Sequence, residues 1–324
     1  MIVPLDIFRA LADATRLRIL QLLRSMELSV GELAQVLGQS QPRVSRHVKI
    51  LCDAGLAARR KEGSWVFVTL GGADAVAPVA ASLDAWNGQE PDRWAVADSA
   101  RLAAVRADRA ASAAAWFEAH AGEWDAIREL HVADDAVETA MAALLGDDHV
   151  GTLIDIGTGT GRMLELFAGS AQAALGIDRS SEMLRLARVK LSEGGVGNAE
   201  LRQADLYALP MRDGAADVAI LHHVLHFAQQ PGAAVAEAAR VLGPGGRLLI
   251  ADFASHDREE LRARDGHTRL GFDDVQLATW FAAAGLGSPT VETLAGGTLT
   301  VKLWLGRKAG ARLRPVLSND AEAA

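Results

Sequence analysis

The spacing of apolar residues changes along the chain, and its first part predicts short helices followed by a hairpin. Helical spacing predicts two short helices within 5–25 and two more helices at 29–37 and 41–54. Ser29, with Glu32 three residues on, is expected to cap the first of these two, and Ser40 is expected to cap the second. Two short β-runs, LAARR and WVFVTL, follow and are joined by KEGS, which predicts a hairpin. A helix, a short turn, a helix and a hairpin in this order indicate a winged helix-turn-helix of the α+β class.

The pattern changes twice further along the chain. Residues 71–149 are rich in alanine and predict a long helical connector. From residue 150 strands alternate with helices, which predicts a Rossmann-like α/β domain with a parallel sheet and right-handed crossovers. Strands are expected at 150–156, 172–178, 199–204, 216–222, 246–252, 289–295 and 298–306. The last two, joined by Ala-Gly-Gly, are expected to form an antiparallel hairpin.

These patterns predict four segments. The first is a winged-helix domain at 1–72, and the second is a helical connector and dimerisation segment at 73–149. The third is an α/β ligand-binding domain at 150–306, and the fourth is a disordered tail at 307–324.

The cysteine count and the first residues of the chain narrow the cellular compartment in which we expect the protein. Cys52 is the single cysteine, so no intrachain disulfide can form, which fits a reducing compartment. The first residues include Asp6 and Asp13 and do not resemble a signal peptide, and no run of about 18 apolar residues predicts a membrane span. We therefore expect a cytoplasmic protein with no membrane partner.

The net charge of −8 is unevenly distributed. Residues 1–70 hold 10 basic and 6 acidic side chains, a balance of +4, whereas the remainder carries −12. A positive segment on an acidic chain suggests a local polyanion partner, although chance alone could produce such a split.

The helix expected at 41–54 has one apolar and one basic face. Three aliphatic side chains share the inner face: Val44, Val48 and Leu51. A helix with a basic outer face can lie in the major groove, where an arginine reads guanine with two hydrogen bonds. Basic side chains of the hairpin would meet phosphates. The candidate DNA-binding residues are Ser40, Gln41, Arg43, Ser45, Arg46, His47, Lys49, Arg60 and Lys61. The alternative is a solvated basic helix.

Residues 7–70 resemble the ArsR family of winged-helix repressors, through FRALADATRLRILQLL and the segment from ELSVGELAQVLGQSQPRVSRHVKIL to WVFVTL. The resemblance implies a homodimer that binds an inverted-repeat operator in double-stranded DNA. Many members sense metals through a cysteine pair in the helix-turn-helix. Ser29 and Gly31 stand at those positions here, so we expect no thiolate metal site, and the signal must come from elsewhere.

The segment LIDIGTGTGRMLELFA (153–168) predicts a strand that ends at Asp155, a glycine-rich turn and a helix. Its Gly-x-Gly-x-Gly spacing differs from the Gly-x-Gly-x-x-Gly of dinucleotide sites, and no Gly-Lys-Ser/Thr follows. Dinucleotides and nucleoside triphosphates are therefore disfavoured. S-adenosylmethionine (SAM) has no phosphate and needs acceptors for its ammonium and ribose hydroxyls instead.

Such acceptors follow the next strands. Asp178 ends the second strand and can accept from both ribose hydroxyls, or it can merely cap the following helix. Asp205 can accept from the adenine amino group while Leu206 covers the ring. His222 and His223 end the fourth strand. All these positions fall at the carboxyl edge of one sheet, where open α/β folds bind ligands.

This ordered set resembles the class I SAM-dependent methyltransferases, nearest the ubiquinone/menaquinone-biosynthesis type. The resemblance covers about 120–255 and includes VLGPGGRLLIADF. It implies that SAM, or its product S-adenosylhomocysteine (SAH), contacts Asp155, Gly157, Thr158, Gly159, Gly161, Asp178, Arg179, Met183, Asp205, Leu206 and His222.

Catalysis is less directly indicated. Methyl transfer from a sulfonium needs alignment above all, and a base only where the nucleophile must lose a proton. His222 and His223 are the candidate catalytic residues, with His226 nearby; alternatively these histidines only shape a polar pocket. In 256–272, basic residues could hold an anionic group or form a solvated helix with ion pairs: Arg258, Arg262, His267 and Arg269.

The sequence thus predicts a transcriptional regulator whose DNA binding responds to SAM or SAH and which retains methyltransferase capability. The alternative is a small-molecule methyltransferase whose DNA-binding domain only regulates its own operon. HHVL stands where DNA methyltransferases carry a Pro-Pro-aromatic or Pro-Cys motif, which disfavours that class. Arsenic methylation is disfavoured because the second half has no cysteine.

Overall fold

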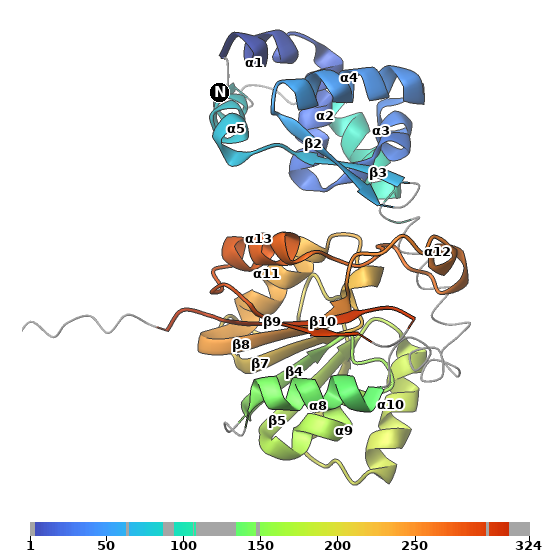
Figure 1. Ribbon diagram of the computed structural model, residues 1–324, viewed down its shortest axis with the longest axis vertical. Coiled ribbons are helices and arrows are strands. Elements are labelled where there is room, and N and C mark those ends of the chain that lie inside the picture. Colours follow the sequence, from blue (N-terminus) through green and yellow to red (C-terminus); the bar gives the residue numbers. More distant parts are fainter. Residues whose placement is uncertain are drawn as a thin grey trace, which may run out of the picture. The chain divides into compact units, whose positions relative to one another are not determined.

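The computed structural model describes residues 4–62, 65–86, 94–105, 107, 134–146, 150–295 and 298–310 (Figure 1). Contacts divide the chain into two compact units. Unit 1 comprises Met1–His120, Phe227–Gln230 and Ser255–Leu270. Unit 2 comprises Ala121–His226, Pro231–Ala254 and Gly271–Ala324.

Unit 1 contains the winged helix expected from the sequence. Its elements are α1 (Pro4–Leu11), α2 (Ala14–Ser25), β1 (Leu28–Ser29), α3 (Val30–Leu37), α4 (Gln41–Asp53), β2 (Ala57–Glu62), β3 (Trp65–Leu70) and α5 (Ala73–Trp86). The strands form a sheet in the order β1-β3-β2, with both pairs antiparallel. The two-residue β1 was not predicted, because a pair so short leaves no alternation in the sequence. The turn of the hairpin lies outside the described residues.

Local capping explains where these helices begin and end. Asp13 accepts from the Arg16 backbone N–H at 3.1 Å and starts α2. Ser29 and Glu32 form the predicted capping box of α3. Ser40 occupies the N-cap of α4, but its side chain makes no capping hydrogen bond, contrary to our expectation. The first turn of α4 contains a proline, whose fixed φ suits the start of a helix.

Unit 2 is built on a seven-stranded sheet in the order β6-β5-β4-β7-β8-β10-β9. The strands are β4 (Val150–Ile156), β5 (Ala171–Asp178), β6 (Ala199–Gln203), β7 (Ala216–His222), β8 (Leu242–Phe253), β9 (Thr290–Leu294) and β10 (Val301–Arg307). The first five in spatial order are parallel, and β10 is antiparallel to both β8 and β9, as predicted. Strand β8 begins earlier than expected, because its glycine-rich start still pairs with β7.

Helices cover both faces of this sheet. They are α8 (Asp134–Leu145), α9 (Arg162–Phe167), α10 (Ser181–Glu193), α11 (Pro231–Val241) and α13 (Asp274–Ala283). Helices α8, α9 and α10 lie on one face, and α11 and α13 lie on the other (Figure 1). Helix α8 is tied to the sheet by Arg247, which donates to the Leu145 carbonyl at 2.6 Å. The sheet region extends to Lys308, whose backbone N–H donates to the Gly246 carbonyl.

Within the part of the chain that the structure describes, no helix has both the length and the apolar character needed to cross a membrane.

Candidate functional site

The glycine-rich turn after β4 requires glycine for two reasons. Gly157 has a φ of 77°, in the left-handed region. A Cβ at this position would lie 2.5 Å from Cγ2 of Val224, so a side chain cannot fit without displacement. Gly161 also has a positive φ, 89°, at the N-cap of α9. The turn is thus held close to the segment that follows β7.

Two carboxylates are bonded to this turn. Asp155 near the end of β4 is buried and accepts from the Thr158 hydroxyl at 2.5 Å. Asp178, the last residue of β5, accepts from the Gly159 backbone N–H at 2.9 Å and from that of Ser180 at 2.8 Å. These bonds connect the tips of β4 and β5 through the turn itself.

Asp178 does not serve as the cap of the next helix. The N-cap of α10 is Ser180, whose side chain accepts from the Met183 backbone N–H at 3.2 Å. Burial raises the pKa of Asp178, and the backbone N–H groups of Ser180 and Gly159 partly oppose this shift. The capping alternative for Asp178 is therefore wrong, and its role as a ribose acceptor stays a prediction.

Other predicted cofactor residues follow the neighbouring strands at the same carboxyl edge of the sheet. Asp205 follows β6, is exposed, and accepts from the Tyr207 backbone N–H at 3.0 Å. Leu206 beside it is half-buried. Arg179 is exposed and accepts through its carbonyl from Gln203, whereas Met183 is buried on α10. The parallel order β6-β5-β4-β7 thus brings Asp205 to the same carboxyl edge as the glycine turn.

Three histidines cluster after β7. His222 ends the strand, His223 has a φ of 53°, and His226 lies in the short 3-10 helix Leu225–Phe227. All three are buried. The ring centroids of His222 and His223 are 4.5 Å apart, and those of His223 and His226 are 6.2 Å apart. The structure therefore brings both predicted catalytic histidines together with His226.

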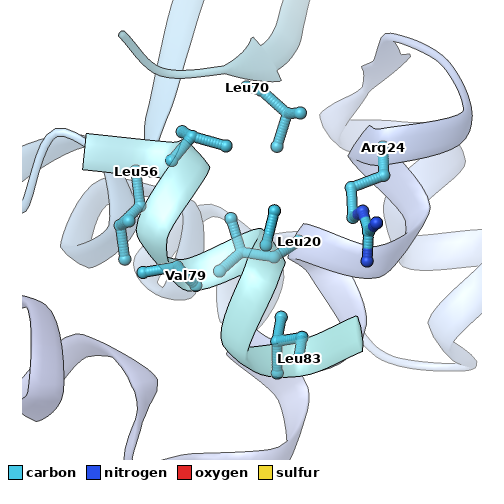
Figure 2. Close-up of a pocket in the computed structure, with 8 residues that line it drawn as sticks. Leu20, Arg24, Leu56, Leu70, Val79 and Leu83 are labelled. Atoms are coloured by element: carbon cyan, nitrogen blue, oxygen red, sulfur yellow. The ribbon is translucent and has the colours of Figure 1, made fainter. Parts of the chain in front are cut away.

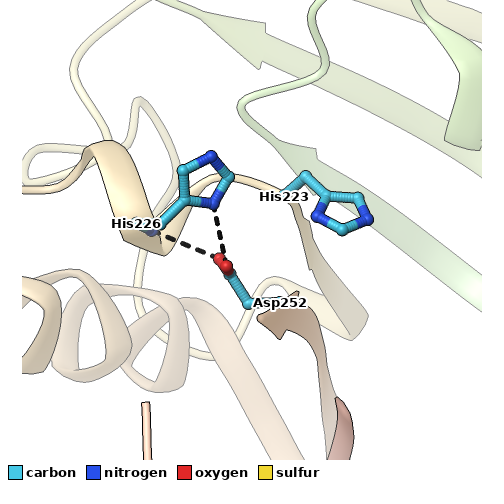
Figure 3. Close-up of side chains that lie close together, drawn as sticks. All are labelled: His223, His226 and Asp252. Atoms are coloured by element: carbon cyan, nitrogen blue, oxygen red, sulfur yellow. Dashed lines mark hydrogen bonds and ion pairs between the residues drawn. The ribbon is translucent and has the colours of Figure 1, made fainter. Parts of the chain in front are cut away.

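A buried carboxylate, Asp252 on β8, completes this cluster and was missed by the sequence analysis. Its Oδ1 lies 2.8 Å from Nδ1 of His226 (Figure 3). Burial raises the pKa of Asp252 to about 6, against the opposing influence of His223. The segment LLIADF reads as a buried strand, so the only signal was an acid placed inside it.

This cluster has two chemical interpretations. His223, His226 and Asp252 offer ligand atoms that lie within 4.8 Å of one another, a set that can hold a metal ion. From the sequence we expected no metal site. The same geometry also suits a positioning pair, in which the carboxylate of Asp252 fixes the orientation of the His226 ring.

The predicted DNA-binding helix α4 exposes most of its basic face. Ser40, Gln41, Arg43, Arg46 and Lys49 are exposed, as is Lys61 on β2. Some groups are engaged within the unit: Lys49 pairs with Asp53 at 2.8 Å, and Arg59 donates to the Ser45 carbonyl at 2.8 Å. His47 is half-buried, with its Nδ1 3.6 Å from Asp13. The side chain of Arg60 lies outside the described residues.

Ser29, one of the two positions that the ArsR resemblance assigns to a cysteine pair in metal-sensing members, has a structural role here. The hydroxyl of Ser29 accepts from the Glu32 backbone N–H at 3.2 Å and donates to the Glu32 carboxylate at 2.8 Å. Cys52 is half-buried on α4, and burial raises the pKa of its thiol. A raised pKa disfavours the thiolate that metal binding requires.

The charged segment 256–272 divides into two parts. Its first part, around the helix α12 (Glu260–Arg264), forms local ion pairs, as the solvated-helix interpretation expected. Arg269 differs, because it is fully buried within unit 1 and pairs with Glu27. Its guanidinium also lies 4.4 Å from the ring centroid of Phe67. Arg269 therefore holds unit 1 together instead of facing solvent.

A small pocket in unit 1 lies between α2, the hairpin and α5 (Figure 2). Its lining is Leu20, Arg24, Leu56, Leu70, Val76, Val79, Ala80 and Leu83. The cavity volume of ≈ 10 Å³ gives room for roughly one water molecule. This pocket is too small for an organic ligand.

Comparisons with known proteins agree with this division. Residues 13–59 match the arsR family of bacterial regulatory proteins, and residues 154–250 match the methyltransferase domain family. Over 70 residues, the chain is 46% identical to the arsenical resistance operon repressor of Escherichia coli K12, covering 21% of this chain and 60% of the repressor.

The second half has relatives of another kind. Over 166 residues, the chain is 36% identical to the ubiquinone/menaquinone biosynthesis C-methyltransferase UbiE of Stutzerimonas stutzeri, covering 47% of this chain and 65% of UbiE. The chain thus spans about 60–65% of the length of these two curated relatives.

A solved structure shares the fold of the second half. It is the complex between the Haloferax volcanii Trm112 methyltransferase activator and the protein described with it as a methyltransferase. The TM-score is 0.51 at 20% identity, over 60% of this chain and 97% of that one. The chain therefore joins an ArsR-family helix-turn-helix domain to a class I methyltransferase domain.

Proposed function

We propose that this protein is an operator-binding regulator whose affinity for DNA changes when its methyltransferase domain binds SAM or SAH. The proposal rests on the combination of two features. The first is the cofactor edge, which we define as the hydrogen-bonded strand tips around Asp155, Gly157 and Asp178. The second is a DNA-binding domain with Ser29 and Gly31 where metal-sensing members carry cysteines. Serine and glycine supply no thiolate at these positions, so the proposed signal comes from the fused domain.

The residues at the strand tips fit SAM. The glycines of the turn carry no side chains that would keep a ligand from its backbone N–H groups, and Val224 packs against Gly157. Asp178 would accept from the ribose hydroxyls, and Asp205 with Leu206 would hold the adenine. Asp155 would face the methionyl part together with Thr158 and the glycines. Bound SAM supplies an electrophilic methyl group.

The DNA partner is an operator with an inverted repeat, bound by a homodimer in the cytoplasm. The exposed arginines of α4, Arg43 and Arg46, support this assignment, because they are placed on one accessible face. Lys61 on the wing would contact phosphate. Phosphate contacts make the affinity fall steeply with salt.

A ligand shifts DNA affinity only if it binds the DNA-competent and DNA-incompetent states differently. The chain itself connects the ligand-binding half to unit 1. Unit 1 includes Phe227–Gln230 and Ser255–Leu270, two segments whose chain neighbours belong to the methyltransferase half. A tenfold shift requires a difference of about 1.4 kcal/mol between the two states, a modest demand.

The test is fluorescence anisotropy of a labelled DNA fragment from upstream of the protein's own gene. Affinity is measured without ligand, with SAM and with SAH, after calorimetry has established saturation. We expect a shift of fivefold or more with one ligand, and none in the Asp178→Ala variant. Equal affinities under verified saturation would reject ligand control of DNA binding.

A second function, methyl transfer to a small molecule, is favoured by the buried pair of His226 and Asp252 beside the cofactor edge. In this alternative the DNA-binding domain only regulates the protein's own operon. Screening isotopically labelled SAM against metabolite extracts tests it. Transfer no greater than in Asp178→Ala would count against this second function.

A further inference from the structure

We infer that Arg269 couples ligand binding to DNA binding, because it fastens two loops of the methyltransferase half to the sheet of the winged helix. The inference rests on the proposed control of DNA affinity by SAM or SAH, and it names the contact through which that control passes. The two loops are Phe227–Gln230 and Ser255–Leu270, both of which belong to unit 1. We call them the edge loops.

Both edge loops leave the sheet of unit 2 at its carboxyl edge. Strand β7 ends at His222 and β8 ends at Phe253, and these parallel strands are neighbours in the sheet. After β7 the chain passes the glycine-rich turn, where a Cβ at Gly157 would lie 2.5 Å from Cγ2 of Val224. Val224 precedes the first edge loop by three residues. A ligand bound at the turn therefore lies next to the chain that leads into this loop.

The longer edge loop is closed at its base. The backbone N–H of His256 donates to the Leu270 carbonyl at 3.0 Å. Just beyond, Gly271 has a φ of 76°, and a Cβ there would lie 2.1 Å from the Ala254 carbonyl oxygen, so only glycine lets the two arms approach this closely. Leu261 and Leu270 are buried. The loop is thus a folded body, and a displacement at its base is carried to its far end.

Arg269 connects the two edge loops to each other. Its Nη2 donates to the Gln229 carbonyl at 2.6 Å. A ring contact supports this bond, because the centroids of Phe227 and His267 are 5.6 Å apart. A change in the first edge loop, which follows the glycine-rich turn, therefore reaches the second.

The same guanidinium contacts the DNA-binding domain. Arg269 pairs with Glu27, which lies between α2 and β1. Its guanidinium carbon is 4.4 Å from the ring centroid of Phe67 on β3. Strand β3 is the central strand of the winged-helix sheet, and Phe67 lies opposite Ser29, the residue that caps α3. Arg269 thus joins the edge loops to the strand that supports both the wing and the start of α3.

Burial makes this contact suitable for a switch. The side chain of Arg269 is fully buried, and that of Glu27 is only 14% exposed. A buried charge that loses its counter-ion is strongly unfavourable, so small separations of the two groups are not tolerated. The edge loops therefore favour discrete positions over a continuous range. A ligand that prefers one of these positions changes the DNA affinity.

The experiment measures a coupling factor, which is the ratio of the DNA affinities with and without saturating ligand. Anisotropy of the labelled upstream fragment gives this factor for the full-length wild type, Arg269→Lys and Glu27→Gln, with SAM and with SAH. Lysine keeps the positive charge but lacks the planar fork that bonds and stacks. We expect a factor of about five or more for one ligand in the wild type, and below about two in both variants.

The affinities of each variant for ligand alone and for DNA alone should stay within about threefold of the wild type. A merely structural role for Arg269 predicts the opposite result, in which the unfolding temperature falls and the coupling factor is unchanged. That result in both variants would overturn the inference. If circular dichroism shows that Arg269→Lys does not fold, Glu27→Gln decides, because glutamine keeps the shape of the side chain and removes its charge.

The matched control is Arg258→Gln. Arg258 is an exposed arginine of the same edge loop, and its ion pair with Glu260, at 3.3 Å, is local. This variant should keep the wild-type coupling factor. Loss of coupling in Arg258→Gln equal to that in Arg269→Lys would show that any charge change in the loop has this effect, and it would remove the special role of Arg269.

Hydrogen exchange gives a readout that needs no ligand. Saturation with the DNA fragment should slow amide exchange across 255–270 in the wild type and leave it unchanged in Glu27→Gln. Unchanged exchange in the wild type would contradict a connection between this edge loop and the DNA-binding domain.

The two possible failures are distinguishable. Wild-type DNA affinities that stay equal with and without bound SAM or SAH would reject the proposed function itself. A coupled wild type whose two variants are coupled equally well would reject only the assignment to Arg269.

Discussion

The DNA-binding face of α4 and the cofactor edge of unit 2 use polar residues in opposite ways. On α4 the candidate contacts are exposed, and Arg43 and Arg46 project from a helix whose inner face makes the core. At the cofactor edge, Asp155 and Asp252 are buried and bonded to their neighbours. Changes on α4 should therefore alter binding with little loss of stability, whereas changes at the cofactor edge should alter both.

The largest effect is expected at Gly157, where the glycine-rich turn has no space for a side chain. Gly157→Ala places a methyl group 2.5 Å from Val224 in a backbone conformation with a φ of 77°. Strain and overpacking should lower the free energy of unfolding by about 2–4 kcal/mol and abolish SAM binding. Chemical denaturation and calorimetry measure these losses.

Gly169→Ala is the control, because nothing lies within 4 Å of a Cβ at that position. It should retain wild-type SAM affinity and stability to within about 0.5 kcal/mol. Equal behaviour of the two variants would show that the turn does not depend on this close approach.

The next effect is pH dependent. The pKa of Asp252 lies near 6 in the fold, above its ordinary 3.8, because burial disfavours the charged form. Between about pH 4 and 6 the folded state holds a proton that the unfolded chain has lost. The contribution of this group to the free energy of unfolding therefore falls as pH rises through that window, by up to about 3 kcal/mol, and is level above it.

Asp252→Asn removes this titration while keeping the shape of the side chain. The stability of the wild type relative to the variant should decline from pH 4 to 6 and then stay constant. The ionisable groups near Asp252 include His223 and His226; Lys302 stands opposite Asp252 on β10 but pairs with Asp274. If the difference in the free energy of unfolding between the two proteins does not change from pH 4 to 6, this result contradicts a buried carboxyl with a raised pKa.

On the DNA-binding face, Arg46→Ala should weaken operator binding by about 1–3 kcal/mol and relax sequence preference at one base position. Because Arg46 is exposed, the unfolding midpoint should barely change. Anisotropy titrations on matched and mutated fragments measure both effects. Arg185→Ala, another exposed arginine, should bind DNA as the wild type does. Uniform weakening across all sequences would assign Arg46 to phosphate contact.

The smallest expected effect concerns Ser29, one of the two positions that the ArsR resemblance assigns to a cysteine pair. Ser29→Ala removes the capping box of α3 and should lower stability by about 1 kcal/mol. Ser40→Ala should cost less, because Ser40 makes no capping bond. Thermal unfolding of the two variants decides between them. Equal losses would mean that Ser29 has no special role in starting α3.

The sequence could predict the elements because their signals are local. Periodicity and caps located the helices of the winged helix and the strands of the sheet, and the capping box at Ser29 is confirmed. The short β1 and the early start of β8 depend on pairing with distant strands, so neither leaves a local pattern. Ser40 shows that a residue type suited to capping need not cap.

The candidate site was predictable only in part, for the same reason. Acids after successive parallel strands share an edge by topology, which is how Asp155, Asp178 and Asp205 were found. The pairing of His226 with Asp252 joins residues 26 positions apart, and nothing in LLIADF marks its acid as a partner of an imidazole. Likewise, Arg269 read as part of a solvated run, whereas the fold buries it against Phe67.

The most direct test of the central claim uses the reciprocity of linked binding. Calorimetry measures the affinity for SAM and for SAH with the free protein and again with the protein saturated by its operator fragment. Linkage requires that DNA change the ligand's affinity by the same factor by which the ligand changes that of DNA. We predict a change of at least fivefold for one of the two ligands. Identical ligand affinities with and without DNA would contradict a regulator that reads its methyltransferase domain.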